Sequence, residues 1–299
     1  MTNASKEADG IQSKFARRPE SLYKNPMNLY AISDLHLGHR ANRDALKALP
    51  IHPNDWLILA GDVGETEAHL DFALHYLTQQ FQKIVWTPGN HDLWTLPSDK
   101  TGTRGEARYR RLVDICRAYG VLTPEDPFTP WPPGNPMCLL APVFVLYDYS
   151  FRPEHVELSR AIEWAAESGI VSSDEELLYT EPYPSAVVWC TLRARYTEKR
   201  LAATPTDYPL VLINHFPLRY DLAHLRRIPR FSLWCGTRRT EDWHTRFHVR
   251  AVVYGHLHIR STHIVDNVRF EEVSLGYPKQ WNPQLGIQGY LRRILTAPG

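Results

Sequence analysis

The sequence has few cysteines and no long apolar run, and both absences exclude classes of protein. Its 299 residues include only four cysteines, which are widely spaced and form no C-x-x-C pair: Cys116, Cys138, Cys190 and Cys235. A disulfide framework or a cysteine-rich metal site is therefore not expected, and the four side chains are predicted to be reduced, mostly buried thiols. No apolar stretch approaches the roughly 20 residues that a membrane-spanning helix requires, so no membrane segment is expected.

The chain also lacks a strong net charge and an apolar segment near residue 1. Its formal net charge is +1, which gives no global attraction to nucleic acid or to a membrane, so an anionic partner needs a local patch. Residues 1–27 carry several basic side chains but not the apolar core of a signal peptide, which predicts a disordered tail and a cytoplasmic protein. With 43% hydrophobic and 22% charged residues, the chain can bury a large core as one domain or as a domain with insertions.

What the sequence does contain is a series of five short apolar runs, each of which ends in a polar cluster. The runs are residues 29–32, 56–60, 84–86, 210–213 and 251–254. The clusters are Asp34-Leu35-His36, Gly61-Asp62, Gly89-Asn90-His91-Asp92, Asn214-His215 and Gly255-His256-Leu257-His258. We interpret the runs as buried strands of a parallel or mixed sheet, whose polar ends converge at one sheet edge and supply oxygen and imidazole ligands for two divalent metals.

The segments between and after these runs predict an α/β fold. Apolar residues recur at helical spacing over 70–81, which indicates a βαβ crossover between the second and third strands. Between the third and fourth strands we expect a polar, Arg-rich loop at 101–111, a Pro-rich loop at 123–136, a strand at 139–147 and two helices near 156–167 and 185–200. The two helices are candidates for a cap over the metals. Residues 262–265 and 268–273 flank Asp266-Asn267 and predict a β-hairpin.

In their order, the five clusters resemble the pattern of the calcineurin-like binuclear metallophosphoesterases. That pattern is D-x-H, G-D, G-N-H-D/E, a lone His and G-H-x-H, and it is complete here from about Asp34 to His258. The resemblance implies an α/β fold: a four-layer αββα sandwich of two mixed β-sheets flanked by helices, with a helical or loop insertion near the active site. It also implies a single metallophosphoesterase domain over residues 28–299, with the insertion or cap within about 97–205.

The resemblance also assigns the metal ligands. Asp62 bridges two divalent ions, and the other ligands are divided between them: Asp34, His36 and His258 for the first ion, and Asn90, His215 and His256 for the second. Four imidazoles with a few oxygens suit Mn, Fe, Zn, Co or Ni better than Mg or Ca, and we favour Mn. Since only two of these ligands are anionic, the pocket should stay electropositive and attract a phosphate ester, which a metal-activated hydroxide would hydrolyse.

Three residues are candidates for catalysis by the same resemblance. His91 directly follows a ligand and would stabilise the transition state or protonate the leaving oxygen, which suits an imidazole because its pKa lies near neutrality. Glu65 would orient His91, or it is an ordinary acidic residue in the first turn of the next helix. Asp92 would also orient His91, or it makes an ordinary buried hydrogen bond.

Five further residues are candidates for binding the substrate: His39, Tyr149, Arg152, Arg226 and Arg230. His39 contacts a phosphate oxygen or caps the following helix. The arginines of segment 226–239 alternate with aromatic residues, which is typical of a site that clamps phosphates and stacks on planar groups, and equally of a solvated loop. The arginines of segment 104–111 either reach the substrate or stand exposed at the start of a helix.

Five short segments carry a narrower resemblance, to actinobacterial phosphoesterases of the phosphopantetheinyl hydrolase kind. They are residues 94–95, 122–127, 146–152, 234–237 and 270–274. This resemblance implies hydrolysis of a phosphodiester, such as the 4'-phosphopantetheine link of a holo acyl carrier protein, which would dock its acidic surface on segment 226–239.

Two other enzymatic functions stay open on the sequence alone. A small-molecule or nucleotide phosphomonoesterase or phosphodiesterase uses the same metal ligands, and so does a nuclease. A nuclease usually needs a strongly basic face, which this near-neutral chain does not clearly have. A non-catalytic scaffold is disfavoured, because the ligand set is complete and His91 is present.

Overall fold

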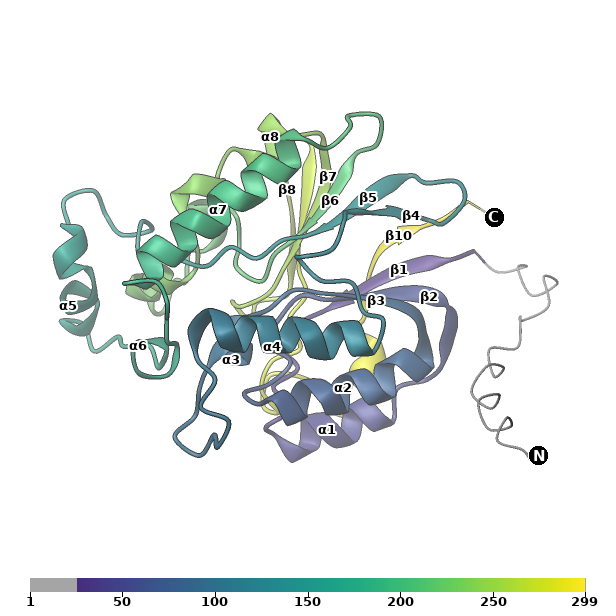
Figure 1. Cartoon of the computed structure of the whole chain (residues 1–299), viewed down its shortest axis with the longest axis horizontal. Coiled ribbons are helices and arrows are strands. Elements are labelled where there is room, and N and C mark those ends of the chain that lie inside the picture. Colours follow the sequence, from purple (N-terminus) through teal and green to yellow (C-terminus); the bar gives the residue numbers. More distant parts are fainter. Residues whose placement is uncertain (1–25, 299) are drawn as a thin grey trace, which may run out of the picture.

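Two β-sheets pack face to face between outer layers of helices in the computed structural model, which describes residues 26–298 (Figure 1). The first sheet has the strand order β10-β1-β2-β3, with the bounds β1 Asn28–Ile32, β2 His52–Leu59, β3 Phe81–Trp86 and β10 Arg292–Thr296. The second sheet has the order β4-β5-β6-β7-β9-β8, with the bounds β4 Thr129–Trp131, β5 Cys138–Pro142, β6 Leu210–Ile213, β7 Val249–Tyr254, β8 Ser261–Val265 and β9 Val268–Glu272. The predicted tail at 1–27 lies outside the described residues, apart from its last two.

Both sheets are mixed, because parallel central strands are flanked by antiparallel edge strands. In the first sheet β10 is antiparallel to β1, and in the second β4 and β8 are antiparallel to β5 and β9. Side chains alternate along each strand, so Trp56 and Ile58 of β2 pack with Val211 of the second sheet, whereas Leu57 and Leu59 pack with the helices. The predicted four-layer α/β sandwich is therefore confirmed.

Helices cover the outer face of each sheet. On the first sheet lie α1 (Arg40–Lys47), α2 (Glu67–Gln80) and α4 (Gly105–Ala118), and on the second lie α7 (Ala186–Ala202) and α8 (Trp243–Arg246) (Figure 1). The predicted βαβ crossover is α2, whose N-cap Thr66 accepts a hydrogen bond from the backbone of His69. Three shorter helices are α3 (Asn90–Leu93), α5 (Ala161–Ala166) and α6 (Asp174–Leu177). Among residues 26–298, no helix combines the length and the hydropathy that a transbilayer segment requires.

The strand expected at 139–147 is shorter than predicted. β5 ends at Pro142, and beyond it the Asn214 side chain pairs with the backbone of Val145. Its Oδ1 accepts a hydrogen bond from Val145 N at 3.0 Å, and its Nδ2 donates to Val145 O at 3.2 Å. An amide side chain thus takes the place of a neighbouring strand, which apolar periodicity alone does not reveal.

The long segment between β3 and β6 contains more regular structure than predicted. The expected loop at 101–111 includes the start of α4, and the Pro-rich stretch 123–136 includes β4. Of the two expected helices, α7 packs its buried Trp189 on Phe144, just after β5, so it belongs to a layer of the sandwich rather than to a cap. The helices α5 and α6 lie at one end of the molecule, outside these layers (Figure 1). A single domain over 28–299 with an insertion within about 97–205 stays a prediction.

Two smaller predictions agree with the structure. The hairpin is formed by β8 and β9, and Asp266 and Asn267 have φ values of 49° and 63°, as a tight two-residue turn requires. All four cysteines are buried and unpaired.

Candidate metal centre

The carboxyl ends of five strands meet at one edge, where the two sheets are joined. Asp34 follows β1, Asp62 follows β2, Asn90 follows β3, His215 follows β6 and His256 follows β7. At this edge the backbone next to Asp34 pairs with the end of β9, since Ser33 N donates to Val273 O at 3.1 Å and Leu275 N donates to Ser33 O at 2.9 Å. Residues far apart in the sequence are therefore gathered in space, as predicted.

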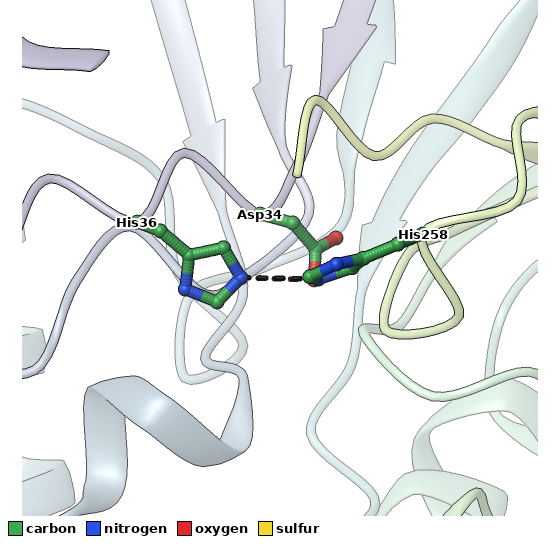
Figure 2. Close-up of side chains that lie close together, drawn as sticks. All are labelled: Asp34, His36 and His258. Carbon is green, nitrogen blue, oxygen red and sulfur yellow. Dashed lines mark hydrogen bonds and ion pairs between the residues drawn. The ribbon is translucent and has the colours of Figure 1, made fainter. Parts of the chain in front are cut away.

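The predicted first site is formed by Asp34, His36 and His258. Their ring nitrogens and carboxylate oxygen point toward one another (Figure 2): His36 Nε2 lies 3.0 Å from His258 Nε2, which is itself 3.0 Å from Asp34 Oδ1. Each of the three residues offers a ligand atom within 4.8 Å of the others. Gln280 Oε1 lies 2.9 Å from His258 Nδ1 and fixes the far side of that ring.

The predicted second site lies beside the first and shares Asp62 with it. Asp62 Oδ2 is 3.4 Å from His215 Nε2, and Asn90 Oδ1 is 3.2 Å from both His215 Nε2 and His256 Nδ1. Ligand atoms of Asp62, His215 and His256 lie within 4.8 Å of one another, and so do those of His36, Asp62 and His91. The seven predicted ligands thus form one continuous cluster.

The chemistry of this cluster fits two divalent cations. The ring nitrogens of His36 and His258 face each other at 3.0 Å with Asp34 Oδ1 beside them, and the buried Nε2 of His256 has no hydrogen-bond partner among residues 26–298. Unpaired buried polar atoms are costly unless a further group satisfies them. A mixture of imidazole, carboxylate and amide oxygen is the donor set that transition metals prefer.

Backbone strain is concentrated at the same residues. Five of the seven predicted ligands adopt a left-handed φ between 42° and 72°: Asp34, His36, Asp62, His256 and His258. Side chains other than glycine rarely adopt this conformation, and it persists where the surrounding structure enforces it at a functional site. Glycine is also required directly before Asp62 and before Asn90. A Cβ on Gly61 would lie 2.6 Å from His215 Nδ1, and one on Gly89 would overlap the Asp62 carboxylate.

The two carboxylates of the centre are ionised. Burial raises the pKa of Asp62, but His215 and His91 outweigh this effect and hold the pKa below its usual value. Burial likewise opposes ionisation of Asp34, and His258 and the other histidines keep its pKa well below the usual range. Two negative charges are therefore available for cations, as the sequence predicts.

His91 is held at the edge of the cluster by three neighbours. Its backbone N donates to Asp62 Oδ1 at 2.9 Å, and its Nδ1 lies 3.6 Å from Glu65 Oε1. Its ring lies on Trp94, with the ring centroids 3.6 Å apart. Burial lowers the pKa of His91, but Asp62 and Glu65 raise it more, so the ring is more basic than usual. Glu65 precedes Thr66, the N-cap of α2, so it is not an acidic residue in the first turn of that helix, and besides His91 it contacts His69 Nδ1 at 3.3 Å.

Asp92 and Arg108 hold the loops that carry these residues. The Asp92 carboxylate accepts hydrogen bonds from the backbone of Asp62, Val63, Gly64 and Gly89 at 2.9–3.2 Å, and no bond to the His91 ring is found within the described residues. This geometry favours the structural role that the sequence left open for Asp92. Arg108 is buried in α4 and donates to the carbonyl oxygens of Asp92 at 2.9 Å and Glu65 at 3.0 Å. The arginines of 104–111 are thus not all exposed.

The sequence missed Asp174, which is buried in α6. Its Oδ1 accepts hydrogen bonds from Asn90 Nδ2 at 2.9 Å and from Trp94 Nε1 at 2.7 Å. It therefore turns the oxygen of the Asn90 amide toward His215 and His256 and fixes the indole that supports His91. Asp174 lies 84 residues from Asn90 in no recognisable motif, so the sequence carries no local signal for it.

Of the five predicted substrate-binding residues, Arg226 shares a cavity with the metal centre. It lines a cavity of about 960 Å³ that also contains Asp62, Asn90, His91, His256 and His258. Arg226 is exposed, and neither it nor Arg227 forms a hydrogen bond or ion pair with another residue of the part that the structure describes.

The other four lie outside the lining of this cavity. Tyr149 donates to Glu175 Oε1 at 2.9 Å, and Arg152 donates to Val156 O at 2.7 Å. Arg230 packs on the Trp164 ring and pairs with Glu167 at 3.2 Å, which ties its segment to α5. His39 is exposed at the N-cap of α1 without a side-chain capping bond, and its ring centroid lies 5.5 Å from that of Tyr277. A role for these four in substrate binding stays a prediction.

Comparison with known proteins defines the class of this fold and centre. The family model of the calcineurin-like phosphoesterases matches residues 27–260, so the chain belongs to this family of phosphoester hydrolases, which use a binuclear metal centre. The predicted resemblance is confirmed.

A particular relative shares most of the chain. The chain is 45% identical over 272 residues to the [acyl-carrier-protein] phosphodiesterase PptH of Mycobacterium tuberculosis, a match that covers 90% of this chain and 84% of the relative. The crystal structure of that organism's phosphopantetheinyl hydrolase PptH superposes with a TM-score of 0.85, at 45% identity, and covers 92% of this chain and 99% of the solved one. The narrower predicted resemblance is confirmed as well.

Proposed function

We propose that this protein is a metal-dependent phosphodiesterase that releases 4'-phosphopantetheine from a holo acyl carrier protein. The observation that carries the proposal is the 45% identity to the carrier-protein phosphodiesterase PptH across 90% of the chain, in combination with a gathered set of seven ligands. The strained backbone of the ligands, together with the presence of both carboxylates and His91, supports an enzyme over a non-catalytic scaffold.

The proposed metal ligands follow from the family resemblance, and the close grouping of these side chains supports them. Asp62 would hold both ions, with Asp34, His36 and His258 on the first and Asn90, His215 and His256 on the second. Two divalent ions in such a site neutralise phosphate charge and lower the pKa of a bound water. The donor set fits Mn, Fe, Zn, Co or Ni, and of these we propose Mn.

The chain's own residues would perform the remaining steps. Hydrolysis places a hydroxyl on phosphorus and breaks the bond between phosphorus and the serine oxygen of the carrier, and that oxygen must receive a proton. His91 would supply the proton from Nε2, because its Nδ1 lies 3.6 Å from Glu65 Oε1 and Nε2 is the ring nitrogen left for the substrate. Asp92 and Arg108 would hold the two loops in register, and Asp174 would orient Asn90.

The carrier protein would dock beside the cavity. Carrier proteins are generally acidic, and complementary charge speeds association and fixes orientation. Within segment 226–239, Arg238 and Arg239 lie near acidic partners, at 3.4 Å from Glu241 and 3.3 Å from Asp148. Arg226 and Arg227 are exposed and lie at the cavity, so these two are the proposed contacts to the carrier.

Mass spectrometry of the carrier tests the proposal. Incubation of a holo acyl carrier protein with the Mn-loaded enzyme should remove the mass of phosphopantetheine and leave the apo form, and the apo carrier incubated in the same way should not change. Each candidate metal is loaded in turn. If none produces this mass loss while an aryl phosphate is still hydrolysed, the protein is a phosphoesterase for another substrate.

A further inference from the structure

The cavity at the metal centre is much larger than a phosphate needs. Its volume of about 960 Å³ lies at the upper end of the range for pockets that enclose a drug-sized ligand. The residues of the centre occupy only one part of its lining. The remaining space is therefore available to the group that is attached to the phosphate.

The part of the cavity beyond the metal centre has an apolar wall. Six large apolar side chains form it, from two separate segments: Leu222, Leu225, Ile228, Phe231, Leu257 and Ile259. Five of the six are aliphatic. Ile228 is 40% exposed and Ile259 is 52% exposed, so the wall presents hydrocarbon to water where it lines the cavity. Burial of this surface by a ligand is favourable in proportion to the area removed from water.

The apolar wall begins directly at a metal ligand. The Phe231 ring is stacked with the ring of His256 at a centroid distance of 6.0 Å and an angle of 20°. Leu257 follows His256 and precedes His258, so the same loop contributes both to the centre and to the wall. Polar side chains also line this cavity, among them Ser261 and His263 of β8 and Asp221 and His224 beside Leu222 and Leu225. A substrate whose phosphate lies at the metal centre would extend along this apolar wall, where polar side chains could form hydrogen bonds with it.

We propose that this wall is a subsite for the pantetheine arm of the substrate, an inference that rests on the proposed function. The arm is a slender, uncharged chain of methyl, methylene, hydroxyl and amide groups that ends in a thiol, which matches an apolar wall with polar groups along it. The serine on the other side of the phosphate belongs to a folded carrier protein, which is far too large to enter a pocket of this size. The arm therefore enters the cavity, and the carrier stays at the mouth beside Arg226 and Arg227.

If the arm binds in the cavity, the enzyme recognises the pantetheine group of the substrate independently of the carrier protein. The enzyme would bind the arm of the diester even when the carrier is replaced by a small leaving group. Two aryl diesters with the same 4-nitrophenyl leaving group test this directly. One carries 4'-pantetheine on the phosphate, and the other carries a methyl group in its place.

The arm-bearing diester should have a KM lower than that of the methyl diester by at least about tenfold, since a few methylenes in an apolar pocket supply that much discrimination. Ile228→Asp should raise the KM of the arm-bearing diester by about tenfold, because a carboxylate there must be desolvated by the arm, and should affect the methyl diester far less. Ile51→Asp is the matched control: Ile51 is 70% exposed and lies outside the cavity, so both constants should stay at wild-type values. Metal content and thermal unfolding verify that each variant is folded.

Failure of this inference and failure of the proposed function give different results. If wild-type enzyme converts the holo carrier to its apo form but shows equal KM values for the two aryl diesters, and Ile228→Asp changes neither, the arm binds elsewhere and the subsite is wrong. If the holo carrier itself is not cleaved with any metal, the proposed function is wrong.

Discussion

Among single residues, Asp62 connects the two halves of the metal centre. Its Oδ1 accepts a hydrogen bond from His91 N at 2.9 Å, and its Oδ2 lies 3.4 Å from His215 Nε2. Asp62→Asn keeps the volume but removes the charge, so we expect both sites to lose metal and phosphodiester hydrolysis to fall nearly to background. Elemental analysis and steady-state rates measure both effects. Wild-type metal content and turnover in this variant would contradict the binuclear assignment.

His91 differs from the ligands because its expected role is proton transfer. His91→Ala removes the ring that faces Glu65 and stacks on Trp94, while the seven ligands stay in place. We expect normal metal content and a rate lower by roughly 10²–10⁴, the usual contribution of one acid or base group. The pH–rate profile should also lose the limb that this group produces. A variant that loses metal instead would show that His91 is a ligand.

Asp174 acts on the metal centre through another side chain. Without its carboxylate, the Asn90 amide can turn and present its NH₂ group to the ion. Asp174→Ala should therefore weaken metal binding at the second site by about 10–100-fold, which is typical for loss of a partner that orients a ligand. Asp174→Asn keeps an oxygen at this position and should retain most of the affinity. Metal titration followed by calorimetry separates the two variants, and equal affinities in Asp174→Ala and wild type would exclude this role.

At the scale of elements, the ends of the strands were predictable and the supports of the loops were not. Apolar runs followed by Asp34, Asp62 or His215 predict both the strands and their meeting point, because ligands released at parallel strand ends share one sheet edge. Arg108 and Asp174 act over long sequence separations with ordinary residue types. A buried arginine inside a polar helix does not change the apolar periodicity of the sequence. Its contacts can therefore be recognised only in the structure.

The end of β9 carries a buried acid whose protonation affects stability. Burial, followed by repulsion from Asp34, raises the pKa of Glu272 from 4.5 to about 7, and Ser274 N donates to its Oε2 at 3.3 Å. This pKa is higher in the folded than in the unfolded chain. The contribution of Glu272 to the free energy of unfolding is therefore complete below about pH 4 and is lost as the pH rises through about 7.

The metal-free protein should therefore lose up to about 3 kcal/mol of unfolding free energy between about pH 4 and pH 8 through this one group. Glu272→Gln keeps the shape and removes the titration, so its stability should fall less over the same interval. Urea unfolding of both proteins at several pH values, in the presence of a chelator, measures the difference. Parallel pH dependences would show that Glu272 stays ionised in the folded protein.

For the whole molecule, the metal centre is also a junction between the two sheets. Asp34, Asp62 and Asn90 follow strands of the first sheet, whereas His215 and His256 follow strands of the second. The four cysteines are unpaired, so no disulfide joins the sheets within the described chain. Ions held by ligands from both sheets would therefore cross-link them at this edge, in addition to the apolar interior that they share.

Removal of metal should consequently destabilise the whole fold and not only the active site. A ligand that binds only the folded state, at a free concentration 100 times its Kd, adds about 2.7 kcal/mol to the unfolding free energy. For a domain of this size, its removal by a chelator should lower Tm by roughly 5 °C. Calorimetry before chelation, after it and after restoration of Mn measures the change. The same treatment of Asp62→Asn should give a much smaller shift, because that variant has little metal to lose. A chelated wild-type protein that is free of metal and yet unchanged in Tm would show that the two sheets are held together without the ions.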